Sequence, residues 1–110
     1  MNIQELRIGN WYKWYAEGQY YYYQVEAKDF LNKYYKNFEP IELTEEILLK
    51  CDDVEFKTNV PKSYYYKNRI LIVKENGLIH DYATRVELPY LHTFQNFIFA
   101  LTNEELKINL

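Results

Sequence analysis

The pattern of apolar and polar residues is clearest at the end of the chain, in residues 89–110. Apolar residues recur there at helical spacing and give a helix one apolar side: Leu91, Phe94, Ile98 and Leu101. Pro89 is well tolerated at a helix start, and Asn103 suits the left-handed residue with which many helices end. Residues 106–110 then alternate between apolar and polar, which predicts a short final strand.

Two aromatic strands are predicted near the start, at residues 6–15 and 20–27. Glu17–Gly18 is the turn signal between them. Trp11 and Trp14 fall on opposite faces of the first strand, so we expect one to be buried and the other partly exposed. In the second strand the odd positions are the more apolar and are assigned to the core: Tyr21, Tyr23, Val25 and Ala27.

A second hairpin is predicted over residues 70–83. Asn76–Gly77 is the preferred pair for a two-residue turn, and such a loop pairs Val73 with His80. The alternation then directs six residues toward the core: Leu71, Val73, Leu78, Tyr82, Val86 and Leu88. The remaining apolar residues of this segment fall on the opposite face: Ile70, Ile72 and Ile79.

A short helix is predicted in the middle of the chain, after an extended segment at residues 38–43. The segment is extended because the residue before Pro40 disfavours helix. Thr44 suits the N-cap, and we expect the helix to end near Asp52. Its core-facing residues are Ile47, Leu48 and Cys51. The other assignments are an irregular or short helical stretch at 29–35, strands at 54–57 and 64–66, and a loop at 58–62.

These elements predict an α+β fold. It contains a curved, mostly antiparallel sheet of about five to seven strands, with one short helix and one longer C-terminal helix packed on it. The 110 residues suffice for one hydrophobic core and are too few for two, so we expect residues 1–110 to form a single domain.

Composition narrows the class of protein. A hydrophobic fraction of 48% excludes wholesale disorder, and no apolar run approaches the roughly 20 residues that cross a membrane. The first ten residues lack a basic region followed by an apolar core, so we expect no secretory signal. Cys51 is the one cysteine and cannot form an internal disulfide, which favours a reducing compartment, most simply the cytoplasm.

Three segments resemble small uncharacterised proteins encoded by bacteriophages and prophages. They read ELRIGNWY from residue 5, EPIELTEEILLKC from residue 39 and LHTFQNFIFALTNEEL from residue 91. Some members of that group have Gly at the position of Asn103, and Asn is the next best residue for a left-handed cap. The resemblance provides no functional residues, and it implies a phage-borne accessory protein that acts on a host system.

No pattern of catalytic or metal-binding residues occurs in the sequence. The two histidines, His80 and His92, have no metal-ligand spacing to carboxylates or to cysteine, and Cys51 lies beside leucines rather than cations. Phosphate-binding glycine loops and nucleophile motifs are also missing from the sequence. We therefore expect no enzyme activity, no catalytic residues, no metal and no cofactor.

The run KSYYYKNR is the strongest candidate for a binding site. Residues 57–74 carry five basic and no acidic side chains, although the whole chain has a net charge of −3. Aromatic rings between cations can stack on bases while the cations hold phosphates. The candidate contact residues are Lys62, Tyr64, Tyr65, Tyr66, Lys67 and Arg69. Tyr20 and Tyr22 extend this platform if they lie on an exposed face.

Three functions are compatible with these observations. The leading hypothesis is a non-enzymatic phage or prophage protein that docks on a host protein or nucleoprotein, as defence inhibitors such as anti-CRISPR proteins do. The second is a single-stranded nucleic-acid-binding (RNA-binding) module that uses the Tyr/Lys surface. The third is a small virion or assembly component. A membrane partner is not expected, and the oligomeric state is left open.

Overall fold

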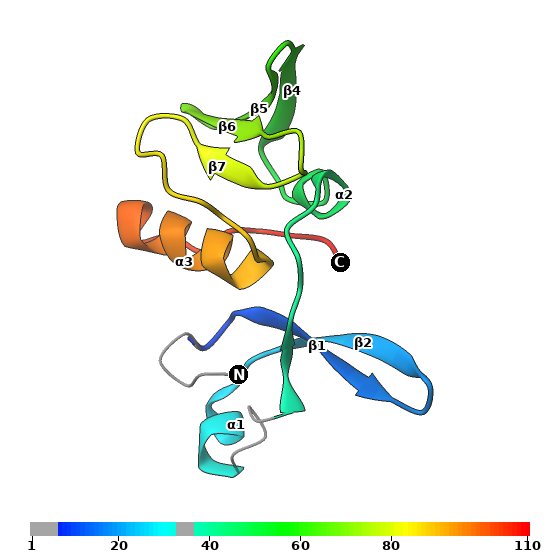
Figure 1. Cartoon of the computed structure of the whole chain (residues 1–110). Helices are drawn as coiled ribbons and strands as arrows, with labels where there is room; N and C mark the ends of the chain where they lie inside the picture. The colour runs from blue at the N-terminus through cyan, green and yellow to red at the C-terminus, as the bar shows by residue number, and fades with distance from the viewer. Residues whose placement is uncertain (1–6, 33–36) are drawn as a thin grey trace. The chain divides into compact units, whose positions relative to one another are not determined.

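The computed structural model describes residues 7–32 and 37–110 and has the predicted α+β fold, with a three-stranded and a four-stranded antiparallel sheet (Figure 1). The described residues divide into two compact units. The first falls within Met1–Glu42 and Tyr90–Glu105, and the second within Leu43–Pro89 and Leu106–Leu110. The strands are thus shared between two open sheets. Among the described residues, no helix has the length and apolar character needed to span a membrane.

The first unit contains β1 (Trp11–Ala16), β2 (Gln19–Gln24), α1 (Ala27–Asn32), β3 (Glu39–Pro40) and α3 (Leu91–Thr102). Its sheet has the order β2-β1-β3. The predicted turn between β1 and β2 is confirmed, because Glu17 and Gly18 both have positive φ, at 52° and 83°. Tyr12, Val25 and Phe38 form the buried cluster of this unit.

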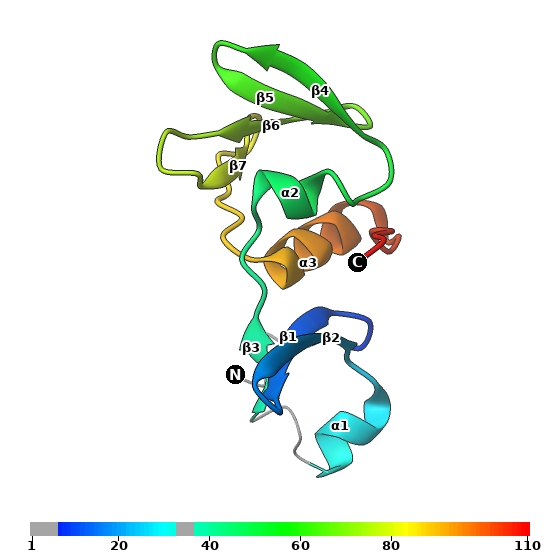
Figure 2. The same ribbon diagram turned by 90° about the vertical axis from the view of Figure 1, so that its right-hand side faces the viewer.

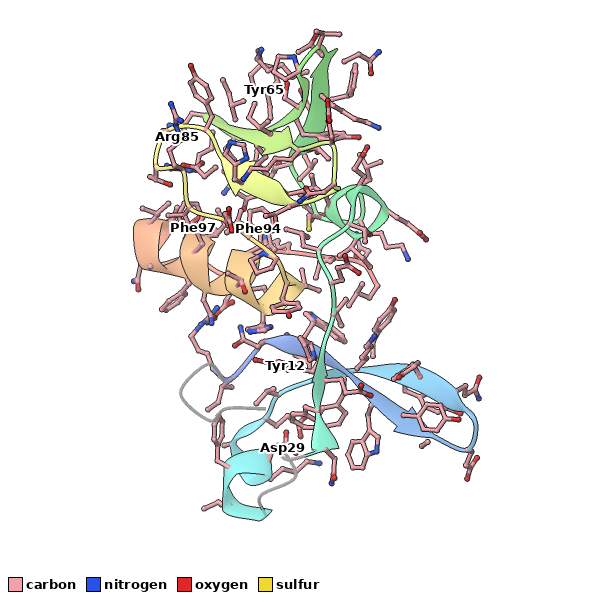
Figure 3. All side chains as sticks on the ribbon, viewed as in Figure 1. Tyr12, Asp29, Tyr65, Arg85, Phe94 and Phe97 are labelled. Atoms are coloured by element: carbon pink, nitrogen blue, oxygen red, sulfur yellow. The ribbon has the colours of Figure 1, made fainter. Side chains whose placement is uncertain are left out.

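Two predictions about the first hairpin are wrong. Trp11 and Trp14 are both half-buried. Tyr12, labelled in Figure 3, is the buried residue of β1, and Trp14, on the same strand face, packs against the buried cluster. Tyr21 and Ala27 are exposed although both were assigned to the core, and Ala27 begins α1 instead of ending the strand. Val25 follows the open end of the hairpin and Tyr23 packs against the buried cluster, whereas Tyr21 lies two residues nearer the turn.

Helix α3 begins and ends where the sequence predicts. Tyr90 is its N-cap, and Asn103 ends it in the left-handed conformation at φ 58°. The predicted apolar side is buried except for its last member, Leu101, which is exposed. Successive residues of a helix are rotated by about 100° around its axis. The buried side of α3 includes His92 and Gln95, and Leu101 lies outside it. Gln95 is drawn inward by hydrogen bonds: it accepts one from the Trp11 N–H (2.8 Å) and donates one to the Gly9 carbonyl (3.0 Å).

The second unit contains α2 (Glu45–Leu48), β4 (Val54–Asn59), β5 (Lys62–Tyr66), β6 (Arg69–Val73) and β7 (Ile79–Asp81). Its sheet has the order β4-β5-β6-β7, and Figure 2 shows α2 beside one face of this sheet. The Thr44 cap is confirmed, because the Ile47 N–H donates to the Thr44 hydroxyl (3.2 Å). Strand β4 is longer than predicted and leaves Val60–Pro61 as the turn before β5. The core-facing residues of this segment are buried as predicted: Ile47, Leu48 and Cys51.

The predicted register of the hairpin between β6 and β7 is wrong by one residue. Val73 pairs with Ile79 and Ile72 with His80. The Lys74 N–H donates to the Leu78 carbonyl (2.9 Å), which leaves a three-residue loop at 75–77, and Gly77 takes the left-handed position at φ 87°. A shift of one residue exchanges the two faces of a strand. Ile79 is therefore buried and Tyr82 exposed, the reverse of the prediction; Val86 is exposed too. Positions outside the shifted segment are buried as predicted: Leu71, Val73 and Leu88.

The end of the chain forms one isolated bridge, between Ile108 and Cys51, where a short strand was predicted. The backbone bonds on either side hold it to the same unit. Asp52 N–H donates to the Lys107 carbonyl (2.9 Å), and Asn109 N–H donates to the Lys50 carbonyl (3.0 Å). The predicted short strand is thus reduced to one bridge with a backbone hydrogen bond on either side.

Candidate contact surface

The predicted Tyr/Lys site lies on β5, the following turn and the start of β6. Strand alternation divides its three tyrosines between two faces. Tyr64 and Tyr66 are each 4% exposed and lie on the buried face. Tyr65, labelled in Figure 3, is 40% exposed and lies on the other face. The structure therefore does not bring the three rings together as one platform.

Lys62 and Tyr64 both bind Glu45, which is the first residue of α2. The Lys62 ammonium lies 2.7 Å from Glu45 Oε2, and the Tyr64 hydroxyl donates to the same oxygen at 2.7 Å. These two hydrogen bonds lower the pKa of Glu45. Burial, together with the neighbouring Glu45 carboxylate, raises the pKa of Tyr64 to about 12. The pair of contacts anchors α2 to β5.

Arg69 is also engaged within the fold. Its guanidinium forms a two-bond fork on Asp81, with Nε to Oδ1 at 3.0 Å and Nη2 to Oδ2 at 2.7 Å. The Thr84 amide and hydroxyl both donate to Asp81 Oδ2, at 2.9 and 2.8 Å. Burial alone would raise the pKa of Asp81, but the hydrogen bonds from Arg69 and Thr84 outweigh it and the pKa is lowered.

Tyr65 and Lys67 are the members of the predicted site that remain directed outward. The Lys57 ammonium lies 5.8 Å from the centre of the Tyr65 ring, a cation–π contact that the sequence analysis did not foresee. Tyr65 and Lys67 line a shallow hollow together with Asp53 and Glu55. Two carboxylates beside one ammonium make this hollow a poor site for a phosphate.

The hairpin of β1 and β2 exposes more aromatic area than the predicted site. Its exposed tyrosines range from 47% to 55% in exposed fraction: Tyr15, Tyr20, Tyr21 and Tyr22. The register pairs Tyr15 with Tyr20 and Lys13 with Tyr22, which places these four side chains on one face of the sheet. We call Lys13, Tyr15, Tyr20 and Tyr22 the tyrosine face.

Contacts within the tyrosine face order its rings. The Tyr15 and Tyr20 rings meet edge to face at 5.1 Å, and the Lys13 ammonium lies 4.6 Å from the centre of the Tyr20 ring. Glu39 of β3 pairs with Lys13 in the sheet, and its charge raises the pKa of Tyr20, with smaller contributions from burial and a hydrogen bond to Glu39. The Tyr20 phenol is therefore a neutral hydrogen-bond donor at neutral pH.

The sequence carried a partial signal for the tyrosine face. The run from Tyr20 to Tyr23 must direct alternate rings to opposite faces, so half of its rings cannot share a core with the other half. The structure confirms that Tyr20 and Tyr22 lie on an exposed face. It places them on β2, a strand of the other sheet from Tyr65. Tyr15 was missed because its exposure depends on the pairing of β1 with β2.

His92 and Cys51 are both buried within the fold. His92 is buried and stacks on Tyr12 at 4.9 Å and on Tyr90 at 5.6 Å. Cys51 is buried, and burial, with a smaller effect of Asp52, raises the pKa of its thiol to about 12. Within residues 7–32 and 37–110, no three side chains of His, Cys, Asp or Glu gather in a group that could hold a metal ion.

Comparisons with protein families, with curated proteins and with solved structures return no match for this chain.

Proposed function

We propose that this protein acts by binding another protein through the tyrosine face, rather than by catalysing a reaction. The observation that carries this proposal is the exposure of Tyr15, Tyr20 and Tyr22 side by side on one sheet face. Clustered exposed aromatic rings are typical of interaction sites, and tyrosine is enriched among the residues that dominate binding energy. Their hydroxyls supply hydrogen bonds, and their rings supply apolar area at little cost in conformational entropy.

The charge of the hairpin favours a protein over a nucleic acid as the partner. Residues 11–24 contain one basic residue, Lys13, and one acidic residue, Glu17. A surface that binds a phosphate backbone needs several cations, and this hairpin offers one. Together with the resemblance to phage proteins, this supports a partner in the host, either a protein or a nucleoprotein. Inhibition of a host defence system, in the manner of anti-CRISPR proteins, is the specific role that we propose.

Paired substitutions on the two surfaces test this proposal. Affinity purification of the wild-type protein from the native host identifies the partner, and calorimetry with the purified partner gives the dissociation constant. We expect Tyr20→Ser with Tyr22→Ser to weaken binding at least tenfold, which is about 1.4 kcal/mol. The control, Tyr65→Ser with Lys67→Ser, also replaces two exposed side chains, one of them a tyrosine, in the other unit, and is expected to leave binding unchanged. Equal affinities for both double variants would overturn the assignment of the tyrosine face.

A single-stranded nucleic-acid-binding module remains the second proposal, and one observation favours it. Tyr65 is exposed, and the Lys57 ammonium lies against its ring, an arrangement in which a base could stack while the cation holds a phosphate. The test is a titration with labelled single-stranded RNA at two salt concentrations. Binding that weakens with salt and is lost on Tyr65→Ala with Lys57→Ala supports this module; no binding at physiological salt excludes it.

A further inference from the structure

A pocket of about 290 Å³ lies on the outer face of the four-stranded sheet. Its lining residues come from β4, the turn before β5, β5, β6 and the segment after β7: Lys57, Pro61, Ser63, Ile70, Ile72 and Tyr82. The register accounts for the grouping, because Ser63 pairs with Ile72 and the Tyr82 N–H donates to the Ile70 carbonyl (2.9 Å). This face is opposite to the one that carries the buried Tyr64.

The hydroxyl of Ser63 is the unusual feature of this pocket. Ser63 is 1% exposed, and its Oγ has no hydrogen-bond partner within the described part of the chain. A buried hydroxyl without a partner destabilises a fold, and an alanine would fill the position without that cost. His80, which pairs with Ile72 in the same row across the sheet, has a second buried polar atom, Nδ1, without a partner among the described residues. Ser63 Oγ and His80 Nδ1 can therefore form hydrogen bonds with a ligand, because the described residues offer them no partner.

The other lining residues define the chemistry that fits. Ile70, Ile72 and Pro61 give apolar walls, and Tyr82 adds an aromatic ring. Lys57 is the one charged residue among the lining residues, so the pocket is positive and has no carboxylate to repel an anion. A volume of about 290 Å³ is at the lower end of the range for ligand pockets, which limits the ligand to the size of one side chain or a small acid.

We propose that this pocket binds a small carboxylic acid with a compact apolar body. The body packs against Ile70 and Ile72, and the carboxylate accepts hydrogen bonds from the Ser63 hydroxyl and the Lys57 ammonium. The two donors differ in kind, one neutral and buried and the other charged and exposed, so their contributions to binding can be separated. This site is independent of the tyrosine face and of the binding function proposed for it.

The test is a titration of the protein with phenylacetate, followed through the assigned isoleucine methyl signals by NMR. We expect the Ile70 and Ile72 methyls to shift with a dissociation constant of about 1 mM, as suits so small a ligand. Phenylacetamide, which has the same shape without the charge, should bind at least fivefold more weakly. Lys57→Gln should weaken phenylacetate at least fivefold, whereas Lys107→Gln, which removes an exposed charge of the same unit outside the pocket, should have no effect.

Ser63→Ala separates a ligand site from a structural role. We expect this variant to unfold at the same or a higher urea concentration than the wild type, because it removes an unpartnered polar atom, and to bind phenylacetate at least fivefold more weakly. Unshifted Ile70 and Ile72 signals would overturn the proposal. Equal binding of phenylacetate and phenylacetamide would do the same, as would wild-type affinity in both Ser63→Ala and Lys57→Gln.

Discussion

The buried ion pair between Arg69 and Asp81 gives the sharpest prediction about stability. The Asp81 side chain is 1% exposed and the Arg69 side chain 23% exposed. Asp81→Asn keeps the shape of the side chain but removes its charge and one oxygen of the fork. The Arg69 guanidinium then stays largely buried without an anion beside it. The Thr84 amide and hydroxyl also lose their acceptor, unless the oxygen of the new side-chain amide faces them.

The magnitude follows from these contacts. Breaking a buried ion pair by removing one partner costs about 3–5 kcal/mol. Arg69 retains some exposure to water, so we expect Asp81→Asn to lower the free energy of unfolding by about 3 kcal/mol, the lower end of that range. This is a large share of the stability of a small domain, which is typically about 5–15 kcal/mol.

Urea denaturation at pH 7, followed by tyrosine and tryptophan fluorescence, measures this loss. The matched control is Glu87→Gln, which breaks an exposed ion pair of the same unit, where the Lys74 ammonium lies 3.2 Å from Glu87 Oε1. Exposed pairs contribute little, so the control should change stability by less than about 0.5 kcal/mol. Equal losses for Asp81→Asn and Glu87→Gln would show that the buried fork stabilises the fold no more than an exposed ion pair does.

Three further predictions follow from buried groups. Because the pKa of Asp81 is lowered in the folded protein, its charged form adds stability above the unfolded pKa of about 4. That stability is lost as pH falls through the folded pKa. The urea midpoints of wild type and Asp81→Asn should therefore converge between pH 5 and pH 2, about the acidic range of an aspartate. A difference between the midpoints that stays constant with pH would contradict this. Gln95→Leu removes the acceptor of the Trp11 N–H and should cost about 1–3 kcal/mol in urea unfolding, whereas Gln24→Leu, which removes an exposed contact to the Gly9 carbonyl, should cost less. With a thiol pKa of about 12, Cys51 should react with a thiol reagent at pH 8 only slowly when folded and rapidly in urea; fast reaction of the folded protein would show that the thiol is accessible.

Short sequence signals correctly predicted where several helices and strands begin or end. The Thr44 cap, the Glu17–Gly18 turn and the Asn103 helix end each depend on one or two residues and their immediate neighbours, so the sequence contains the whole cause. The loop at Asn76–Gly77 was predicted one residue too short. Glycine with positive φ suits both two-residue and three-residue loops, and β6 is apolar on both faces, so alternation could not distinguish the two registers.

The candidate site was harder to predict because exposure is decided by partners distant in sequence. KSYYYKNR presents an unbroken row of aromatic and basic residues, but a strand directs alternate residues to opposite faces. One of those faces receives Glu45 from α2, which engages Lys62 and Tyr64. Arg69 is engaged by Asp81 of β7. Neither carboxylate could be assigned to its partner from spacing along the chain.

The contrast between the two tyrosine runs explains why the tyrosine face is the better candidate for function. On β5, the hydroxyl of Tyr64 donates to a carboxylate of its own fold, so burial of that ring is compensated inside the protein. On β2, the Tyr20 ring contacts the Lys13 ammonium and the Tyr15 ring, and Tyr22 pairs with Lys13 in the sheet. Tyr20 and Tyr22 each remain about half exposed. The apolar area of these rings is available to a partner without any rearrangement of the core. A binding partner that covers them gains hydrophobic stabilisation that folding has not already used. The same argument predicts that substituting Tyr20 and Tyr22 weakens binding while leaving the unfolding midpoint nearly unchanged, whereas substituting Tyr64 lowers the midpoint.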